Sequence, residues 1–167
     1  VIILPNNENI VLGAEQVRLL SAKRVEIVPT ETIPQGGAAL LAFNYEADLE
    51  ANIAAMKEAI STVKTVEVTT AVRPAKIGEL EMKEGQAIAF LDGEAVAVGD
   101  SVPQIVDEVL DQLDMAASEI VTIYYGADTE ASEAEGLAEA LRRKYPHIEV
   151  EAIYGGQPHY NYIVSVE

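Results

Sequence analysis

Short apolar runs alternate with stretches of helical periodicity in the first part of the chain. Residues 1–5 and 24–29 form short runs rich in Val and Ile, and such runs are typical of strands buried on both faces of a parallel sheet. Apolar residues recur between them at near-helical spacing, which predicts a helix with one buried face. The positions expected on that face are Ile10, Val11, Ala14, Val17, Leu20 and Ala22. The pattern therefore predicts a strand–helix–strand unit with a right-handed crossover.

A further helix and a longer strand follow. The apolar residues Leu49, Ile53, Met56 and Ile60 lie at spacings of four, three and four, which places them on one helical face. Residues 63–72 are rich in Val and Thr, which favours a strand. The segment "RPAK" then interrupts the pattern, and we place a lobe boundary here. The expected N-terminal α/β lobe covers residues 1–74 and the C-terminal lobe covers residues 75–167.

Residues 77–98 change character and predict an antiparallel β-meander. Three short strand-like segments lie at residues 77–82, 86–91 and 94–99. Asp92 and Gly93 separate the last two, and this pair favours a type I′ hairpin turn because both residues tolerate a positive φ.

The last part of the chain returns to alternating helices and strands. Ser101 and Gln104 predict a capping box at the start of one helix, and Thr129 is expected to cap a second helix that ends near Tyr145. Strands are expected at residues 119–125, 148–154 and 161–167. The whole pattern predicts a two-lobed α/β fold, with a mostly parallel sheet, flanking helices and the antiparallel meander.

Composition narrows the class of protein. The chain has 167 residues, of which 49% are hydrophobic, and a net charge of -17. This length suits one domain or two small lobes, and the charge opposes binding to a phosphate backbone, so we expect no nucleic-acid partner. No apolar run approaches the roughly 20 residues of a membrane span. The chain contains no cysteine, and a cytoplasmic location is the simplest expectation.

Three polar loops follow predicted strands, where ligands bind in open α/β sheets. The candidate residues are Asn6, Asn7, Thr30, Thr32, Gln35, Gly36, Gly155, Gly156, Gln157 and His159. Their hydroxyl and amide groups could hydrogen-bond a carboxylate or a phosphate at a helix N-terminus. The same residues also have a structural interpretation, with Thr30 or Thr32 as a helix cap, Pro34 in a first helical turn and "GGQPHY" as a turn. The sequence leaves both interpretations open.

Catalytic motifs are missing from the sequence. The loops contain neither a Walker A motif nor G-x-G-x-x-G, and no G-x-S-x-G nucleophile elbow occurs. His147 and His159 are the only histidines, and this pair lacks the ligand spacing of a metal site, so we expect no metal. The residues alone therefore favour a binding or docking module.

The runs "LPNN", "VPTETIPQG" and "GGQP", together with "KTVEVTTAVR" and "EIVTIYYGAD", carry a resemblance that extends over residues 1–167. In matching order they resemble the C-terminal region of the DhaL-domain proteins related to dihydroxyacetone kinase, a family that includes the fatty acid kinase component FakA. The resemblance implies a DegV-like two-lobed fold. It also implies that ATP and Mg²⁺ bind to a separate N-terminal DhaL-like domain of a longer parent protein. The C-terminal domain formed by residues 1–167 is then expected to hold no cofactor.

The same resemblance implies a function. The parent is expected to be an ATP-dependent kinase that phosphorylates a fatty acid carboxyl group, and this domain, non-catalytic alone, is expected to engage the acyl-binding DegV-family carrier, FakB. DegV-family carriers hold the carboxylate partly through a His-Thr-Gly-Pro-Gly loop, and Gly155 and Gly156 stand here where that His-Thr would be. Two alternatives stay open: a lobe that binds a fatty acid or another anion through Thr30, Thr32, Gln35 and Gln157, and a module that dimerises the parent.

Overall fold

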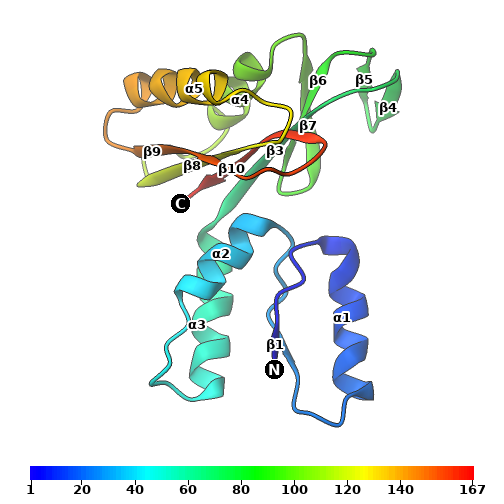
Figure 1. The fold of residues 1–167 in the computed structure, drawn as a ribbon, viewed down its shortest axis with the longest axis vertical. Helices are drawn as coiled ribbons and strands as arrows, with labels where there is room; N and C mark the ends of the chain where they lie inside the picture. The colour runs from blue at the N-terminus through cyan, green and yellow to red at the C-terminus, as the bar shows by residue number, and fades with distance from the viewer. The chain divides into compact units, whose positions relative to one another are not determined.

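The computed structural model describes residues 1–167, which divide into two compact units, Val1–Val63 and Lys64–Glu167 (Figure 1). The sequence predicts this boundary after residue 74. The structure places it earlier, because the strand formed by residues 64–70 pairs with two later strands of the second unit. A strand in the middle of a sheet cannot be separated from its neighbours without breaking both hydrogen-bond ladders.

The first unit contains two very short strands and three helices. They are β1 (Ile2–Ile3), α1 (Glu8–Leu20), β2 (Glu26–Ile27), α2 (Ile33–Leu41) and α3 (Leu49–Thr62). Strands β1 and β2 pair in parallel, which confirms the strand–helix–strand unit. The expectation of strands buried on both faces is wrong for β1, whose two residues are half-buried, because β2 is its only partner in a two-stranded sheet.

Helix α1 forms where the periodicity predicts it, but its apolar face is mostly uncovered. Of the six positions expected to be buried, Ala14 is buried and packs with Val25 and Ile27. Ile10 is 53% exposed and Leu20 is 86% exposed. The prediction of a buried stripe is therefore wrong over most of α1, because a two-stranded sheet of two-residue strands offers too little surface to cover it.

Helix α3 follows the prediction more closely. Met56 is buried against Val28 and Ala39, and Ile53 and Ile60 pack on the edge of the same cluster. A buried polar group also belongs here, because the Asn52 amide donates to the carbonyl of Asn44 at 2.9 Å and its oxygen accepts the Asn44 N–H at 2.7 Å. This side chain ties the loop before α3 to the first turn of the helix.

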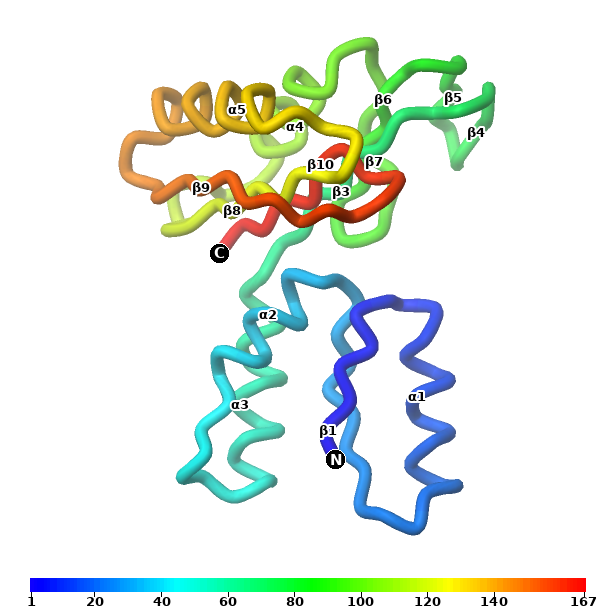
Figure 2. Tube along the Cα trace, in the orientation of Figure 1, coloured from blue at the N-terminus to red at the C-terminus, as the bar shows by residue number.

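The second unit is built on a six-stranded mixed sheet with the order β7-β6-β3-β10-β8-β9 (Figure 2). Its strands are β3 (Lys64–Thr70), β6 (Ala87–Leu91), β7 (Glu94–Gly99), β8 (Ile120–Tyr125), β9 (Glu149–Tyr154) and β10 (Tyr160–Val166). The α/β fold class is confirmed, but the parallel part is smaller than expected. Only β8 and β9 pair in parallel, because the last strand, β10, enters antiparallel between β3 and β8.

The meander contains the predicted hairpin and one unpredicted hairpin. Asp92 and Gly93 have φ values of 48° and 86°, which confirms the tight turn between β6 and β7. The segment expected as one strand over residues 77–82 instead turns at Gly78, where φ is 58°. It contributes to two strands, β4 (Ala75–Ile77) and β5 (Leu80–Met82), which form a separate antiparallel sheet.

Helices α4 (Val102–Leu110) and α5 (Ala131–Lys144) cover one face of the six-stranded sheet (Figure 1). Their buried residues join the core beneath them: Ile105, Val106, Val109 and Leu110 from α4, and Ala134, Leu137, Ala138 and Leu141 from α5. No helix of the structure is both long enough and apolar enough to cross a bilayer.

Both predicted caps of these helices are wrong. Ser101 occupies the N-cap position of α4 but makes no side-chain capping bond. Glu130, not Thr129, is the N-cap residue of α5. The Thr129 hydroxyl instead donates to the carbonyl of Asn161 at 3.2 Å, which ties the start of α5 to the sheet.

Candidate functional site

The loop after β1 is locked to the loop after β2 by two hydrogen bonds. The Asn6 N–H donates to the Thr30 hydroxyl oxygen at 3.0 Å, and that hydroxyl donates to Asn6 Oδ1 at 2.7 Å. Thr30 is fully buried, and Asn6 has a φ of 54°. The pair satisfies polar groups that would otherwise be costly to bury, and the Thr30 hydroxyl and the Asn6 amide oxygen are engaged with each other.

Gly36 completes this contact from the first turn of α2. A Cβ atom built at Gly36 would collide with the Asn6 side chain. A glycine is therefore required for the close approach of α2 to the loop after β1. We name the cluster of Asn6, Thr30 and Gly36 the Asn6 clasp.

The other candidate residues of the first unit cap helices. Thr32 is the N-cap residue of α2, and its hydroxyl oxygen accepts the Gln35 N–H at 3.3 Å. Gln35 Oε1 accepts the Glu31 N–H at 2.8 Å, and Asn7 caps α1 through the Asn9 N–H at 2.9 Å. Pro34 lies in the first turn of α2. The capping interpretation of Thr32 and Pro34 is thus confirmed.

The remaining four candidates form the connection from β9 to β10 in the second unit. The Gln157 amide donates to the carbonyl of Tyr124 at 2.9 Å, and the Gly155 N–H donates to the carbonyl of Tyr125 at 3.0 Å. Gly156 and His159 have φ values of 67° and 73°. The His159 side chain is exposed. The loop therefore uses its glycines and its glutamine to turn the chain.

The structure thus brings six of the ten sequence candidates together in two separate groups, of which the first is bonded within itself and the second to the backbone of β8. Asn6, Thr30 and Gly36 meet in the first unit, and Gly155, Gly156 and Gln157 meet in the second. Neither group presents a free cation. No group of three or more His, Cys, Asp or Glu side chains in the structure is arranged to hold a metal ion.

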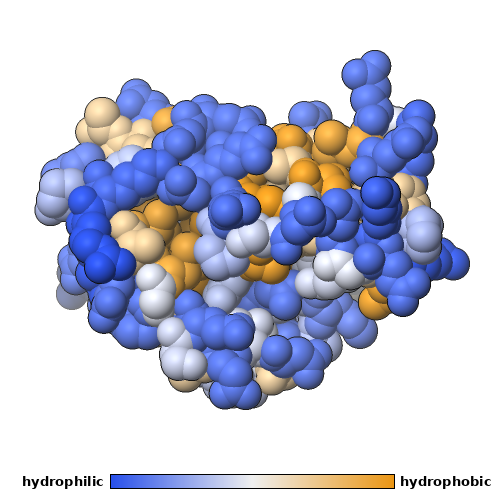
Figure 3. Space-filling model, turned by 90° about the horizontal axis from the view of Figure 1, so that it is seen from above, coloured by the Kyte–Doolittle hydropathy of each residue, from blue (hydrophilic) through white to orange (hydrophobic).

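A concave site lies elsewhere, between α4 and α5, and none of the candidate loop residues lines it. Its volume is about 860 Å³. Hydrophobic side chains show through between hydrophilic ones on this face of the molecule (Figure 3). We name it the α4–α5 groove. Its lining comprises Asp100, Ser101, Val102, Pro103, Gln104, Asp107, Thr129, Glu133, Gly136, Leu137, Ala140, Leu141, Lys144, Asn161 and Tyr162.

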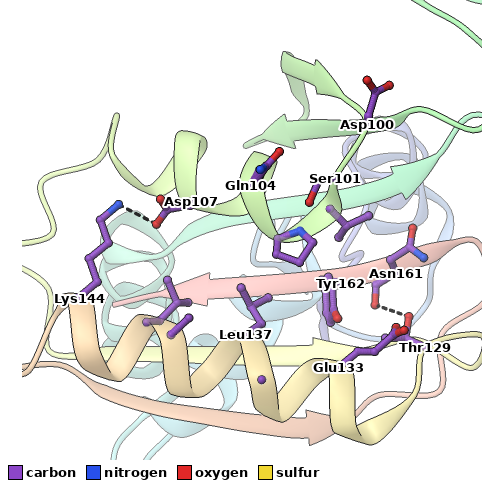
Figure 4. A pocket seen from close by; sticks show the side chains of 15 residues that line it. Asp100, Ser101, Gln104, Asp107, Thr129, Glu133, Leu137, Lys144, Asn161 and Tyr162 are labelled. Atoms are coloured by element: carbon purple, nitrogen blue, oxygen red, sulfur yellow. Dashed lines mark hydrogen bonds and ion pairs between the residues drawn. The ribbon is translucent and has the colours of Figure 1, made fainter.

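The groove has an apolar floor and an acidic rim (Figure 4). Leu137 and Leu141 from α5 and Tyr162 from β10 form the floor. Asp100 and Glu133 are exposed carboxylates on the rim. Burial raises the pKa of the Tyr162 hydroxyl, and the negative charge of Glu133 adds to this effect. The floor therefore consists of neutral side chains at physiological pH.

Lys144 is the only cation that lines the groove, and it is already paired. Its Nζ lies 2.6 Å from Asp107 Oδ1 and 2.7 Å from Asp111 Oδ1. Hydrogen bonds to Asp107 and Asp111 raise the pKa of Lys144, while the bonds from Lys144 and Tyr145 lower the pKa of Asp111. Three lining carboxylates, Asp100, Asp107 and Glu133, therefore face one lysine that is shared with a further aspartate, and the rim is negative.

Small side chains open the groove along α5. Gly136 and Ala140 line it one helical turn apart. A Cβ atom built at Gly136 would meet no atom within 4 Å. Glycine in a helix interior costs about 1 kcal/mol relative to alanine, so Gly136 keeps this side of α5 open at a cost in helix stability.

A smaller depression of about 320 Å³ lies in the first unit, beside β2 and α3. Arg24 and Lys57 line it, and Arg24 contacts Glu50 at 2.6 Å and Glu26 at 3.2 Å. Both carboxylates raise the pKa of Arg24, and Arg24 lowers the pKa of Glu50. The charge of Arg24 is therefore compensated within the protein.

Comparison with known proteins identifies the family. The family model for the C-terminal domain of FakA-like fatty acid kinase proteins matches residues 1–167, and the chain belongs to this family. Protein YloV of Bacillus subtilis (strain 168) is 41% identical over 167 residues, which cover all of this chain and 30% of YloV. The chain thus spans about a third of the length of this relative.

Solved structures confirm the fold. A DegV family protein from Corynebacterium glutamicum superposes with a TM-score of 0.67 at 15% identity, over 99% of this chain and 74% of that one. The fatty acid kinase B3 protein of Streptococcus pneumoniae, solved with linoleic acid, superposes with a TM-score of 0.65 at 10% identity, over 99% of this chain and 70% of that one. The chain therefore has a DegV-like fold.

Proposed function

We propose that this chain is the non-catalytic docking domain of a FakA-type fatty acid kinase, and that it engages an acyl-binding carrier of the DegV family. Phosphoryl transfer from ATP and Mg²⁺ to the fatty acid carboxyl group would then take place on another domain of the parent protein. One observation carries the proposal. In a chain of the FakA-like family, the polar loops that could hold a phosphate or a carboxylate are bonded to the protein itself.

Phosphoryl transfer needs positioned charges around the nucleotide, and the chain offers none in these loops. Kinase sites combine a metal held by acidic side chains with a cation on the phosphates. The candidate residues of these loops are Asn, Thr, Gln, Gly and His, and His159 is the only titratable side chain among them. Arg24 and Lys144 are each paired with two carboxylates, and Lys57 is a further cation of the smaller depression. This distribution of charge supports binding rather than chemistry.

Charge also supports a protein partner. The chain carries 28 acidic and 11 basic residues. A surface of this kind attracts a partner with a basic patch and raises the rate of encounter at low ionic strength.

Calorimetric titration of the chain with an acyl-loaded carrier tests the proposal. We expect saturable heat, and an affinity that weakens as salt is raised from about 50 to 500 mM, because screening shortens the range of charge attraction. Absence of heat at high micromolar concentrations would contradict docking. An affinity that does not change with salt would contradict the role of charge attraction and leave docking itself supported.

A second candidate function is the binding of a small hydrophobic ligand. The observation that favours it is the α4–α5 groove, whose volume of about 860 Å³ falls within the range of about 300–1,000 Å³ for small-molecule sites. Native mass spectrometry of the protein purified from cells distinguishes the two. A co-purified acyl chain supports the ligand-binding function, and a bare polypeptide mass supports docking alone.

A further inference from the structure

We propose that the α4–α5 groove is the surface on which the domain receives its carrier, and that its occupant is a positively charged amphipathic helix of that carrier. The inference rests on the proposed function and names the site and the chemistry of the contact. It does not involve the polar loops that the sequence singles out.

The shape of the groove fits a helix laid into a cleft. Two helices, α4 and α5, form the walls, and Leu137, Leu141 and Tyr162 form an apolar floor (Figure 4). Recognition of this type places the apolar face of one helix into a hydrophobic groove through side chains one turn apart. Gly136 and Ala140 leave space above α5. Such small residues allow the backbone of a partner helix to come close.

The charge of the rim selects the occupant. Asp100 and Glu133 are exposed and make no ion pair within the chain, although Asp100 accepts a hydrogen bond from Gln86 at 2.8 Å. Lys or Arg residues flanking an apolar stripe would find carboxylate partners here. A free fatty acid would bring a further carboxylate to this rim, where the one cation, Lys144, is already shared by Asp107 and Asp111.

The polar end of the groove is built into the fold. Thr129 donates to the Asn161 carbonyl, and Asn161 Oδ1 accepts from the Thr70 hydroxyl at 3.0 Å. These bonds hold the floor strand β10 against β3 and the start of α5. These contacts order one end of the groove before a partner binds, and such preorganisation lowers the entropic cost of docking.

A larger side chain on the open side of α5 fills the groove and tests the inference without changing a core residue. In Gly136→Leu the new side chain starts in open space, and leucine favours a helix more than glycine does. We expect the fold to be retained, with an unchanged or higher melting temperature. We expect affinity for the acyl-loaded carrier to fall about tenfold or more, because the apolar contacts at the centre of the groove are blocked.

Gly13→Leu is the matched control. Gly13 also lies inside a helix, α1, and a Cβ atom built there meets nothing within 4 Å. The same exchange of glycine for leucine in the first unit should leave carrier affinity unchanged. Equal losses in both variants would overturn the assignment of the groove.

Neutralising the rim provides an independent variant. The pair Asp100→Asn and Glu133→Gln should weaken binding several-fold at low salt and reduce its dependence on salt. The control pair Glu79→Gln and Glu84→Gln removes two exposed carboxylates that do not line the groove. This pair should change carrier affinity and its salt dependence less than the rim pair does. Equal salt dependence in the two pairs would contradict the charge match.

The outcomes separate this inference from the function on which it rests. If the unaltered chain does not bind the carrier, the docking function itself fails. If it binds and Gly136→Leu binds equally well, docking stands and the groove is the wrong surface. Native mass spectrometry could instead show that oleic acid binds to the unaltered chain and not to Gly136→Leu. The occupant of the groove would then be a small molecule, and the proposal of a carrier helix would be wrong.

Discussion

Each of the two compact units is stabilised internally by a different set of contacts. In Lys64–Glu167 a six-stranded sheet and two helices enclose a continuous core that includes Ile123, Leu141 and Val164. In Val1–Val63 the sheet has two strands of two residues, its apolar clusters are small, and several apolar residues of α1 are exposed. The Asn6 clasp and the helix caps connect its elements instead. Hydrophobic composition is therefore a poor guide to burial unless enough sheet surface is present to cover the helices.

Expressing the two units as separate fragments should give the largest difference in stability between them. We expect residues 64–167 to fold alone, with a cooperative thermal transition and dispersed amide signals in a two-dimensional NMR spectrum. We expect residues 1–63 alone to be largely unfolded, because two short strands and three small helices bury too little apolar surface to offset the loss of chain entropy. A cooperative transition in residues 1–63 would contradict this contrast.

Truncation of one apolar side chain in each unit sharpens the comparison. Ile123 is fully buried in β8, whereas Leu20 at the end of α1 is 86% exposed. Ile123→Ala should lower the free energy of unfolding by about 2–5 kcal/mol, because it leaves a cavity in a close-packed core. Leu20→Ala should change it by about 0.5 kcal/mol or less. Urea denaturation measures both, and a Leu20→Ala loss similar to that of Ile123→Ala would show that α1 is covered.

The neighbouring glycines of α2 test the Asn6 clasp. Gly36→Ala should destabilise the protein by about 1–3 kcal/mol, because the new methyl group displaces the Asn6 side chain and leaves the buried Thr30 hydroxyl without its acceptor. Gly37→Ala meets open space and should stabilise α2 by about 0.5–1 kcal/mol. Thermal melts of the two variants should therefore shift in opposite directions. Shifts of the same sign would contradict the role of the clasp.

The smallest predicted effect concerns Glu67 in β3. Burial raises the pKa of this carboxyl above its ordinary value of 4.5. A raised folded-state pKa means that the folded protein binds the proton more tightly, so stability rises as pH falls through that pKa, and the charged form is unfavourable above it. Glu67→Gln should therefore be more stable than the unaltered chain at pH 7, and this advantage should shrink as pH falls toward 4.5.

Unfolding curves at several pH values measure this difference. Glu84→Gln at an exposed position is the control and should show little change over the same range. A Glu67→Gln variant that is less stable at pH 7 would mean that the charged carboxylate is stabilised in the folded protein.

Local features of the fold could be predicted from sequence. The Asp92–Gly93 turn and the capping role of Thr32 depend on a few adjacent residues, and both are confirmed. Placement in space could not be predicted in the same way. Thr129 has the chemistry of a cap, but its hydroxyl bonds to Asn161, a residue 32 positions away, and the cap prediction fails. Strand β3 looked like the end of the first lobe because its partners, β6 and β10, come later in the chain.

The candidate site was harder to predict than the fold. Polar loops at strand ends attract attention because ligands bind there in many α/β proteins. In this chain their side chains bond to other groups of the protein, and a sequence cannot show that Asn6 and Gly36 lie in contact. The α4–α5 groove depends on the packing of two helices whose facing residues are far apart in sequence. Gly136 lies inside an otherwise regular helix, but Gly13 of α1 does so too, and a helical glycine alone therefore does not locate the groove.

Competition with the intact enzyme tests the docking function most directly. An excess of this chain is added to a reaction that contains an intact FakA-type kinase, its acyl-loaded carrier and ATP, and acyl-phosphate formation is measured. We expect inhibition that additional carrier relieves, and no phosphoryl transfer when the chain replaces the kinase. Undiminished acyl-phosphate formation at saturating chain, or transfer of phosphate by the chain alone, would contradict the account.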